Sequence, residues 1–393
     1  MHQRHYPPPL ERNYHRSSAG QNRKPEHRQD MTSEASATMN LERPWEKPWP
    51  SDGLEALHKC PICNASERQV LHSDLVDSSF RCAPGSWTLW QCAKCRSAYL
   101  DPRPTPETIG LAYENYYTHG AGSSKVDYQS LNLLRKIRRR LVNGYSRRRY
   151  GSADEPAYEL GFYLAHLVPF IRKVTDRQYR HIPFPAGNAN KLLDIGCGNG
   201  DFLMLASSCG WEVCGLDPDA NAVLSATNRG LDVHQAGEEH FKGESDLFDV
   251  ITLSHVIEHV HSPRDTIENC FNLLKPGGMI WIETPNIDSF GYELFGKYWR
   301  GLETPRHITI LNRQSLHNII SKSGFEKIRD IAIPSPTFLT YRASLAILMG
   351  ESLQSPISNP RSIAFKAYLA NVKENIFPSR REFLTVAARK PIY

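Results

Sequence analysis

Short apolar runs alternate with amphipathic segments between residues 191 and 388 of this chain. The short runs predict strands at 191–195, 212–216, 231–234, 248–254, 279–283, 326–332 and 382–388. The segments in which apolar residues recur every three or four positions predict helices at 201–209, 218–229, 263–274 and 314–323. This alternation is typical of an α/β fold, so we expect a Rossmann-like, seven-stranded and mostly parallel sheet with helices on both faces.

The same pattern divides the rest of the chain. Residues 1–50 are rich in Pro, Arg, His and Gln and poor in aliphatic residues, which predicts a disordered tail. A small cysteine-containing module is expected at 51–106, and a helical, basic connector at 107–182. The α/β domain would then span 183–393, with a helical insertion at about 336–372.

Composition narrows the setting in which the protein acts. The net charge of +5 is too mild to indicate nucleic-acid binding by itself. No run approaches 18 apolar residues, and the N-terminus lacks the apolar region of a secretory signal. Nine cysteines, four of them in two CxxC pairs, favour metal binding in a reducing compartment over a disulfide framework. We therefore expect a cytoplasmic protein. Peripheral contact with the inner face of a membrane remains an alternative.

The strongest chemical signal is the segment LLDIGCGNGD at 192–201, where a strand runs into a glycine-rich turn and a helix. Its spacing is GxGxG, whereas a dinucleotide-binding turn has GxGxxG. Asp194 precedes the first glycine by two positions, where a carboxylate would repel a pyrophosphate but attract a cationic amino group. Asp217 ends the next strand, where a carboxylate can accept hydrogen bonds from ribose hydroxyls. These features favour S-adenosylmethionine over NAD.

Four segments, LLDIGCGNGDFL, EVCGLDPDA, FDVITLSHVIEHV and LLKPGGMIWIETPN, resemble successive motifs of class I S-adenosylmethionine-dependent methyltransferases. They are most similar to the group that includes the ubiquinone-biosynthesis O-methyltransferases, and the resemblance covers about 190–333. It implies that the glycine-rich turn holds the methionine portion, Asp217 the ribose and Glu238 the adenine, while Ser254 and His255 close the site. The cofactor-binding residues implied in this way are Asp194, Gly196, Cys197, Gly198, Asn199, Gly200, Asp217, Pro218, Glu238, Ser254 and His255.

An HxxEH pattern runs from His255 to His259. It matches the inverted zincin motif, but a peptidase would need it within a long helix, and here it follows a strand. The ubiquinone methyltransferases have an acid-x-x-Glu-His cluster linked to metal dependence, and in this chain His255 stands where the acid would be. Two interpretations remain: Glu258 and His259 hold a second divalent metal, or they orient loops over the cofactor.

The segment YWRGLETPRH at 298–307 supplies candidates for acceptor chemistry. We expect His307 to act as a general base on an acceptor hydroxyl, with His259 as a further catalytic candidate. Arg300 and Arg306 are expected to hold an anionic acceptor, and Arg306 is counted among the catalytic residues. The alternative is that these residues only fasten the loop to the sheet.

Cys60, Cys63, Cys92 and Cys95 form the two CxxC pairs of the N-terminal module. Two such turns can present four thiolates to one ion, so we expect a structural zinc site; a redox role is the alternative.

The acceptor is expected to be a small molecule or a glycan-type molecule, methylated on oxygen or carbon. Zinc-ribbon methyltransferases with an element similar to Tyr-Tyr-Thr-His at 116–119 are linked to sugar and glycan modification. The eight Lys and Arg residues at 135–149 and the apolar segment 338–349 suggest contact with a membrane surface or a lipid-linked acceptor. A solvated helix face and burial in a helical subdomain explain the two segments equally well. An RNA methyltransferase and a non-catalytic binding protein remain as alternatives, with nucleic acid the less favoured partner.

Overall fold

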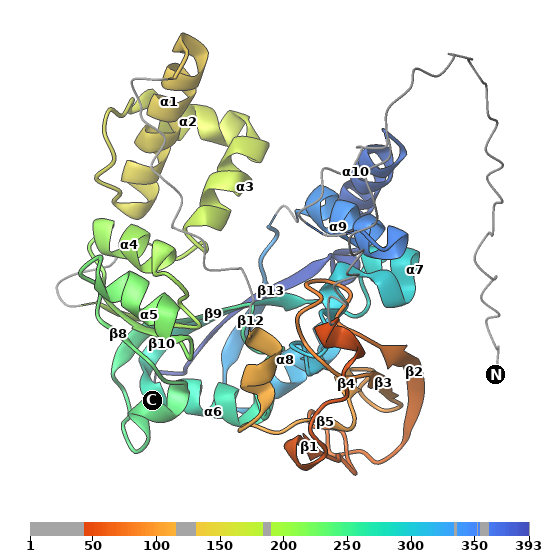
Figure 1. The fold of residues 1–393 in the computed structure, drawn as a ribbon. Coiled ribbons are helices and arrows are strands. Elements are labelled where there is room, and N and C mark those ends of the chain that lie inside the picture. The colour runs from red at the N-terminus through yellow and green to blue at the C-terminus, as the bar shows by residue number, and fades with distance from the viewer. Residues whose placement is uncertain are drawn as a thin grey trace, which may run out of the picture. The chain divides into compact units, whose positions relative to one another are not determined.

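Seven strands form the main sheet in the computed structural model, which describes residues 43–114, 131–183, 190–333, 336–351, 353 and 361–392. They are β6 (Lys191–Ile195), β7 (Glu212–Leu216), β8 (Val233–His234), β9 (Phe248–Ser254), β10 (Leu274–Pro285), β12 (Glu326–Asp330) and β13 (Phe383–Arg389). Their order is β12-β13-β10-β9-β6-β7-β8. The strand β13 runs antiparallel to both neighbours, and the remaining pairs are parallel. This confirms the predicted Rossmann-like, mostly parallel sheet (Figure 1).

Helices connect these strands and cover both faces of the sheet. Those predicted from the sequence are α4 (Asp201–Ser208), α5 (Ala220–Thr227), α6 (Pro263–Leu273) and α8 (Arg313–Lys322). Neighbouring residues of a strand point to opposite faces. Leu193 belongs to the core that contains the buried residues of α6 and α8, whereas Leu192 belongs to the core that contains those of α4 and α5.

Three further helices precede the sheet: α1 (Leu133–Tyr150), α2 (Leu160–Leu167) and α3 (Pro169–Gln178). They pack into the core on the same side as α4 and α5. The hydroxyls of Tyr145 and Tyr150 both donate to Asp176 Oδ1, at 2.6 and 2.7 Å, which ties α1 to α3. Within the expected connector these three helices are joined by irregular segments, and the element at 116–119 lies outside the described residues.

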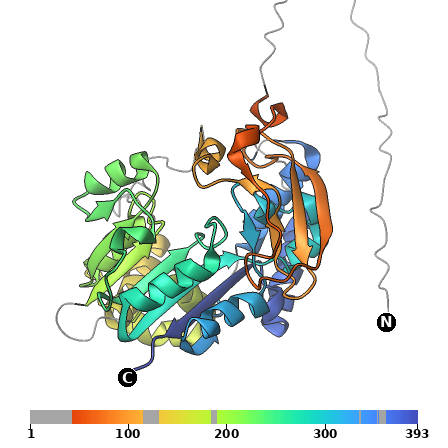
Figure 2. The same ribbon diagram turned by 90° about the horizontal axis from the view of Figure 1, so that it is seen from below.

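The N-terminal module contains β1 (Leu54–Glu55), β2 (Arg68–Leu75), β3 (Trp87–Cys92), β4 (Ala98–Leu100) and β5 (Arg103–Pro104), with 3₁₀ turns at Pro44–Glu46, Ser51–Gly53 and Ile109–Tyr113. A distant strand, β11 (Thr309–Ile310), pairs with β4 and completes a sheet of order β11-β4-β3-β2. Figure 2 shows the orange strands of this module beside blue segments from the last third of the chain. The module expected at 51–106 is thus built together with part of the C-terminal half.

The remaining elements form two insertions. One lies between β10 and α8 and contains α7 (Phe290–Phe295), 3₁₀ turns at Gly296–Tyr298 and Arg300–Leu302, and β11. The other lies between β12 and β13, where a helical insertion is predicted, and contains α9 (Thr337–Met349), α10 (Arg361–Ile376) and a 3₁₀ turn at Pro378–Arg380. A further 3₁₀ turn, Glu238–Phe241, follows β8. Among the described residues, no helix combines the length and the apolar character needed to cross a membrane.

Candidate functional site

The glycine-rich turn joins the end of β6 to the start of α4. Gly196, Gly198 and Gly200 all have positive φ, at 69°, 55° and 79°. A Cβ on Gly196 would lie 2.5 Å from Val256 Cγ2, and one on Gly200 would lie 2.3 Å from Leu231 Cδ1. Both the backbone conformation and the space therefore require glycine at these two positions.

Asp217 follows β7 and faces the glycine-rich turn. Its Oδ2 accepts a hydrogen bond from Gly198 N at 2.7 Å, and its Oδ1 accepts one from Asp219 N at 3.0 Å. The residue is 7% exposed and lines a cavity of about 1160 Å³ at this edge of the sheet. Two backbone donors thus hold the carboxylate against the cavity.

Asp194 lies in β6 behind the turn and is fully buried. Its Oδ1 accepts from Arg180 Nη1 at 2.5 Å and from Thr252 Oγ1 at 2.7 Å, so a cation already lies beside it. Its Oδ2 has no hydrogen-bond partner among the described residues, although a buried carboxylate oxygen normally has one. This oxygen lacks one donor among the described residues, but Asp194 itself does not line the cavity.

The other predicted cofactor residues divide into two groups. The residues that line the cavity are Gly196, Gly198, Asp217, Pro218, Glu238 and His255. Those that do not line it are Asp194 in β6, Ser254 at the end of β9, and Cys197, Asn199 and Gly200 in the glycine-rich turn. The structure therefore gathers the expected cofactor residues at the carboxyl ends of β6, β7 and β9, where open α/β sheets bind ligands.

His255 lies directly after β9 and is held between two carboxylates. Its Nδ1 is 3.3 Å from Glu258 Oε1, and its Nε2 is 3.4 Å from Glu283 Oε1. Burial disfavours the charged ring, but the hydrogen bonds to Glu258 and Glu283 outweigh it and raise the pKa of His255 to about 10. Burial also opposes ionisation of Glu258, yet its bond to His255 lowers the pKa of this carboxyl to about 2. His255 is therefore an imidazolium at neutral pH, and Glu258 a carboxylate.

His259 and His307 line the same cavity, with ring centroids 4.7 Å apart. The Nδ1 of His259 lies 2.9 Å from the carbonyl oxygen of Arg306, and that of His307 lies 2.8 Å from the carbonyl oxygen of Gly301. Because a carbonyl oxygen can only accept, each Nδ1 carries a proton, and the neutral form of such a ring has its lone pair on Nε2. Burial lowers the pKa of His307 to about 4, so this ring is neutral at pH 7.

Glu258, His259 and His307 offer donor atoms that all lie within 4.8 Å of one another. One further contact of Glu258 orients it, since its Oε2 accepts from Thr284 Oγ1 at 2.9 Å. A carboxylate and two imidazoles whose Nδ1–H groups are anchored on carbonyl oxygens form a donor set suited to a divalent metal. The arrangement suits proton transfer as well, and both uses need a neutral ring.

Comparison with known proteins bears on these residues directly. Residues 163–329 match a family model described as a methyltransferase domain. The chain carries a methyltransferase domain of the S-adenosylmethionine-dependent kind. The matched residues contain the glycine-rich turn, Asp217 and the HxxEH segment, so these parts of the cavity lining belong to this domain.

The methyltransferase domain also has curated relatives. It is 38% identical over 103 residues to a ubiquinone biosynthesis O-methyltransferase of Cronobacter sakazakii, a match covering 24% of this chain and 42% of the relative. The mitochondrial ubiquinone biosynthesis O-methyltransferase of Rattus norvegicus is 31% identical over 138 residues, covering 32% of this chain and 40% of the relative. The chain thus spans less than half the length of each of these relatives.

Among solved structures, a methyltransferase from Archaeoglobus fulgidus described as SAM dependent is 23% identical to this chain. The alignment covers 58% of this chain and all of the other, with a TM-score of 0.39.

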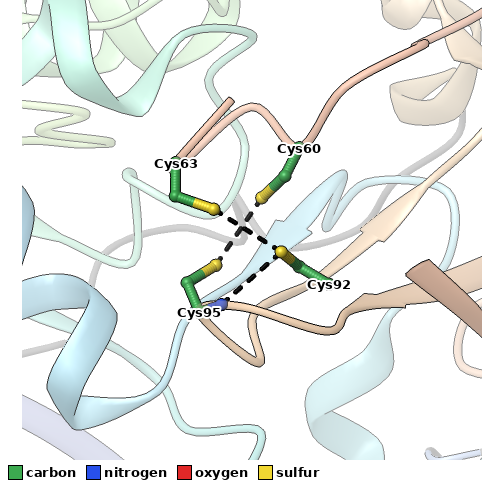
Figure 3. Close-up of side chains that lie close together, drawn as sticks. All are labelled: Cys60, Cys63, Cys92 and Cys95. Atoms are coloured by element: carbon green, nitrogen blue, oxygen red, sulfur yellow. Dashed lines mark hydrogen bonds between the residues drawn. The ribbon is translucent and has the colours of Figure 1, made fainter. Parts of the chain in front are cut away.

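The four cysteines that precede the methyltransferase domain converge as expected (Figure 3). Cys60 Sγ and Cys95 Sγ lie 3.6 Å apart, and Cys63 Sγ and Cys92 Sγ lie 3.5 Å apart. A disulfide would need about 2.05 Å. Four sulfurs bound at about 2.3 Å around one tetrahedral ion lie about 3.8 Å from one another, close to the distances seen. The geometry fits a Cys₄ metal site.

The expectation that Arg306 holds an anionic acceptor is not supported by the structure. Arg306 is fully buried and does not line the cavity; its guanidinium pairs with Asp77 and Glu303. Anion binding would have to break these pairs inside the protein. Arg300, by contrast, lines the cavity, where it forms an ion pair with Glu303.

Two residues near the cavity of the methyltransferase domain are not predicted from the sequence. Arg180 contacts Asp194 and stacks over the ring of Phe202 at 3.7 Å. The hydroxyl of Tyr113 lies 3.0 Å from His259 Nδ1 and comes from the N-terminal module. Both residues come from outside the recognised motifs, so only their place in the fold reveals them.

Proposed function

We propose that this protein transfers a methyl group from S-adenosylmethionine to a small-molecule or glycan-type acceptor, on oxygen or carbon. One observation carries the proposal: the same cavity of about 1160 Å³ is lined by Asp217 and the glycine-rich turn and also by His259 and His307. Such a cavity has room for a donor and an acceptor together, since small-molecule sites measure about 300–1,000 Å³.

The residues present fit the cofactor. Gly196 lines the cavity at a position where a Cβ would collide with Val256, and Asp194 behind the turn has a buried oxygen that lacks a donor among the described residues. Asp217 would accept from the ribose hydroxyls and Glu238 would face the adenine. When bound, S-adenosylmethionine supplies an electrophilic methyl group on a sulfonium. The protein then has to bring the acceptor in line with that methyl group and exclude water.

His307 and His259 would act on the acceptor. The Nε2 of His307 can accept the proton of an acceptor hydroxyl, because its Nδ1–H is held by Gly301. A pKa of about 4 makes His307 a weaker base than an ordinary histidine. The same low pKa keeps the ring neutral at pH 7, and a metal ligand has to be neutral.

This lowered pKa favours a second role, in which Glu258, His259 and His307 hold a divalent ion that lowers the pKa of the acceptor hydroxyl. Removal of this ion by a chelator, with the Cys₄ site left loaded, would then abolish turnover and leave cofactor binding intact. Full activity after chelation would support the proton-acceptor role instead.

The acceptor class rests on weaker support. Two relatives are ubiquinone biosynthesis O-methyltransferases by name, which favours O-methylation of a small molecule. Arg300 at the cavity wall would suit an acceptor that carries a phosphate or a carboxylate, and sugar nucleotides meet that condition. None of the nine cysteines, all of which the structure describes, forms a disulfide, which suits the reducing cytoplasm.

Calorimetric titration with S-adenosylmethionine tests the cofactor proposal. We expect micromolar binding by the wild type and, for Asp217→Ala, a loss of at least about tenfold, because charge-assisted hydrogen bonds disappear. Asp246→Ala, which removes an exposed carboxylate paired with Lys390, is the matched control and should bind normally. Absence of binding in the wild type would overturn the proposal. If the wild type binds S-adenosylmethionine, methyl transfer is then assayed with catechols and sugar nucleotides as acceptors.

A further inference from the structure

Helix α10 turns its large apolar side chains outward. The residues that it buries are Ile363, Ala367, Ala370 and Glu374. The exposed apolar residues are Phe365, Tyr368, Leu369, Val372 and Ile376, with 60%, 63%, 40%, 42% and 66% of their surface accessible. Their spacings of three, one, three and four place them in one stripe on the side opposite the buried residues. A soluble helix normally has the reverse arrangement, so this stripe requires a partner.

The buried side of α10 packs on α9, which is part of the cavity wall. Thr337 Oγ1, at the start of α9, donates to Asn371 Oδ1 of α10 at 2.6 Å. The next turns of α9 place Leu339, Thr340 and Ala343 along the cavity, and Leu339 is also 60% exposed. In Figure 1 the two helices lie together in blue. The apolar stripe therefore lies on the outer side of the helical layer that borders the proposed acceptor end.

The charges on α10 indicate what covers the stripe. Lys366 and Lys373 are both exposed and lie seven residues apart, so they follow the same flank of the stripe. The only acidic residue of this helix, Glu374, points inward and is 4% exposed. An apolar stripe flanked by lysines without exposed acids is the pattern of a helix that lies on an anionic lipid surface.

A second copy of the chain fits less well. The described α10 offers no exposed acid that could meet Lys366 and Lys373 of another copy. The stripe from Phe365 to Ile376 is also only about 17 Å long at about 1.5 Å per residue. Five side chains are also far fewer than the roughly 20–30 residues that each partner contributes to a stable interface.

We infer that α10 docks on the surface of a bilayer that contains anionic lipids, with Phe365, Tyr368, Leu369, Val372 and Ile376 entering the headgroup region and the two lysines contacting lipid phosphates. The cavity wall formed by α9 is then held beside the membrane. This contact is independent of methyl transfer, so it is measured without the cofactor.

Cosedimentation of the full chain with vesicles tests the inference. We expect binding to phosphatidylcholine vesicles that contain phosphatidylglycerol, and much weaker binding to phosphatidylcholine alone. The double variant Lys366→Gln/Lys373→Gln should partition about thirtyfold more weakly. Phe365→Gln/Ile376→Gln should lose at least about a hundredfold. All four residues are exposed, so both variants should fold, which thermal unfolding verifies.

Matched controls remove the same groups elsewhere. Lys242→Gln/Lys322→Gln removes two lysines outside α10, and Ile392→Gln removes an apolar side chain that is 81% exposed. Both should bind vesicles as the wild type does. Absence of binding to anionic vesicles would overturn the inference, as would equal binding by the α10 variants, which would move the contact to another surface. A dimer that these variants dissociate, without vesicle binding, would identify a second copy as the occupant.

Discussion

Arg306 and Asp77 form an ion pair from which water is excluded: Nη2 lies 2.5 Å from Oδ1, and neither side chain is exposed. Asp77 belongs to the turn between β2 and β3 of the N-terminal module, and Arg306 to the loop before β11. The same guanidinium donates to the carbonyl oxygen of Ala112 at 2.7 Å, and the Arg306 carbonyl oxygen accepts from His259. One side chain thus joins the module to the loop that carries the candidate acceptor residues.

Replacement of Arg306 by leucine should destabilise the protein by about 3–5 kcal/mol, because it leaves the buried carboxylate of Asp77 without its counter-charge. Urea unfolding measures this change. The control Arg313→Leu breaks a pair with Asp330 in which the arginine is 41% exposed, and should cost less than about 1 kcal/mol. Similar losses for the two variants would mean that the buried pair has no special weight.

Zinc should be present at one ion per chain and should depend on the two CxxC turns. Cys63→Ser should lose the ion. Because β4 pairs with β11, amide exchange should then rise at Ala98–Leu100 and at Thr309–Ile310, while β6 keeps its protection. Metal analysis and hydrogen exchange follow the two effects. Cys209→Ser, a thiol that belongs to no candidate metal group among the described residues, is the control. A wild-type protein that contains no zinc after reducing purification would count against the site.

The order of elements in the α/β domain was predictable from the sequence because each strand is a short apolar run between turns. The last strand, for example, was expected at 382–388 and spans Phe383–Arg389. The glycine-rich turn was predictable too. Gly196 and Gly200 have positive φ, which side chains other than glycine rarely adopt, so the glycines mark the turn in the sequence.

Contacts across long sequence distances were not predictable. The buried pair of Arg306 with Asp77 could not be predicted, because the two residues lie more than two hundred positions apart and nothing local marks the pair. The addition of β11 to the sheet of the N-terminal module could not be predicted either, because a strand of two residues has no recognisable periodicity. Likewise, the lowered pKa of His307 follows from its burial, which the surrounding polar sequence does not indicate.

His307→Ala should lower turnover by about 10²–10⁴-fold while the affinity for S-adenosylmethionine changes little. The residue lines the cavity, where we propose that it acts on the acceptor and not on the cofactor. Steady-state kinetics and calorimetry on the same preparation separate the two effects. Because the pKa of His307 is lowered to about 4, this residue stays unprotonated below pH 6.5. Its protonation should therefore not reduce wild-type activity until the pH approaches 4. Equal losses of turnover and cofactor affinity would indicate a structural role.

Glu382 should make stability fall as the pH rises. Burial raises the pKa of this carboxyl to about 7 from 4.5, with Glu374 nearby adding to the shift, although Trp299 Nε1 and Gly291 N donate to it. The folded protein therefore binds a proton that the unfolded chain has already released between these two values. The stabilising contribution is complete below pH 4.5 and is lost as the pH passes through 7.

The loss amounts to about 3 kcal/mol of unfolding free energy by pH 9, at about 1.36 kcal/mol per pKa unit. Urea unfolding from pH 5 to 9 measures it as the difference between the wild type and Glu382→Gln, which stays neutral throughout. That difference should grow in favour of the variant as the pH rises. Glu293→Gln, at an exposed carboxylate paired with Arg380, should give a flat difference. A flat difference for Glu382→Gln too would mean that the buried carboxyl ionises at its ordinary pH, and that the contacts from Trp299 and Gly291 compensate its burial fully.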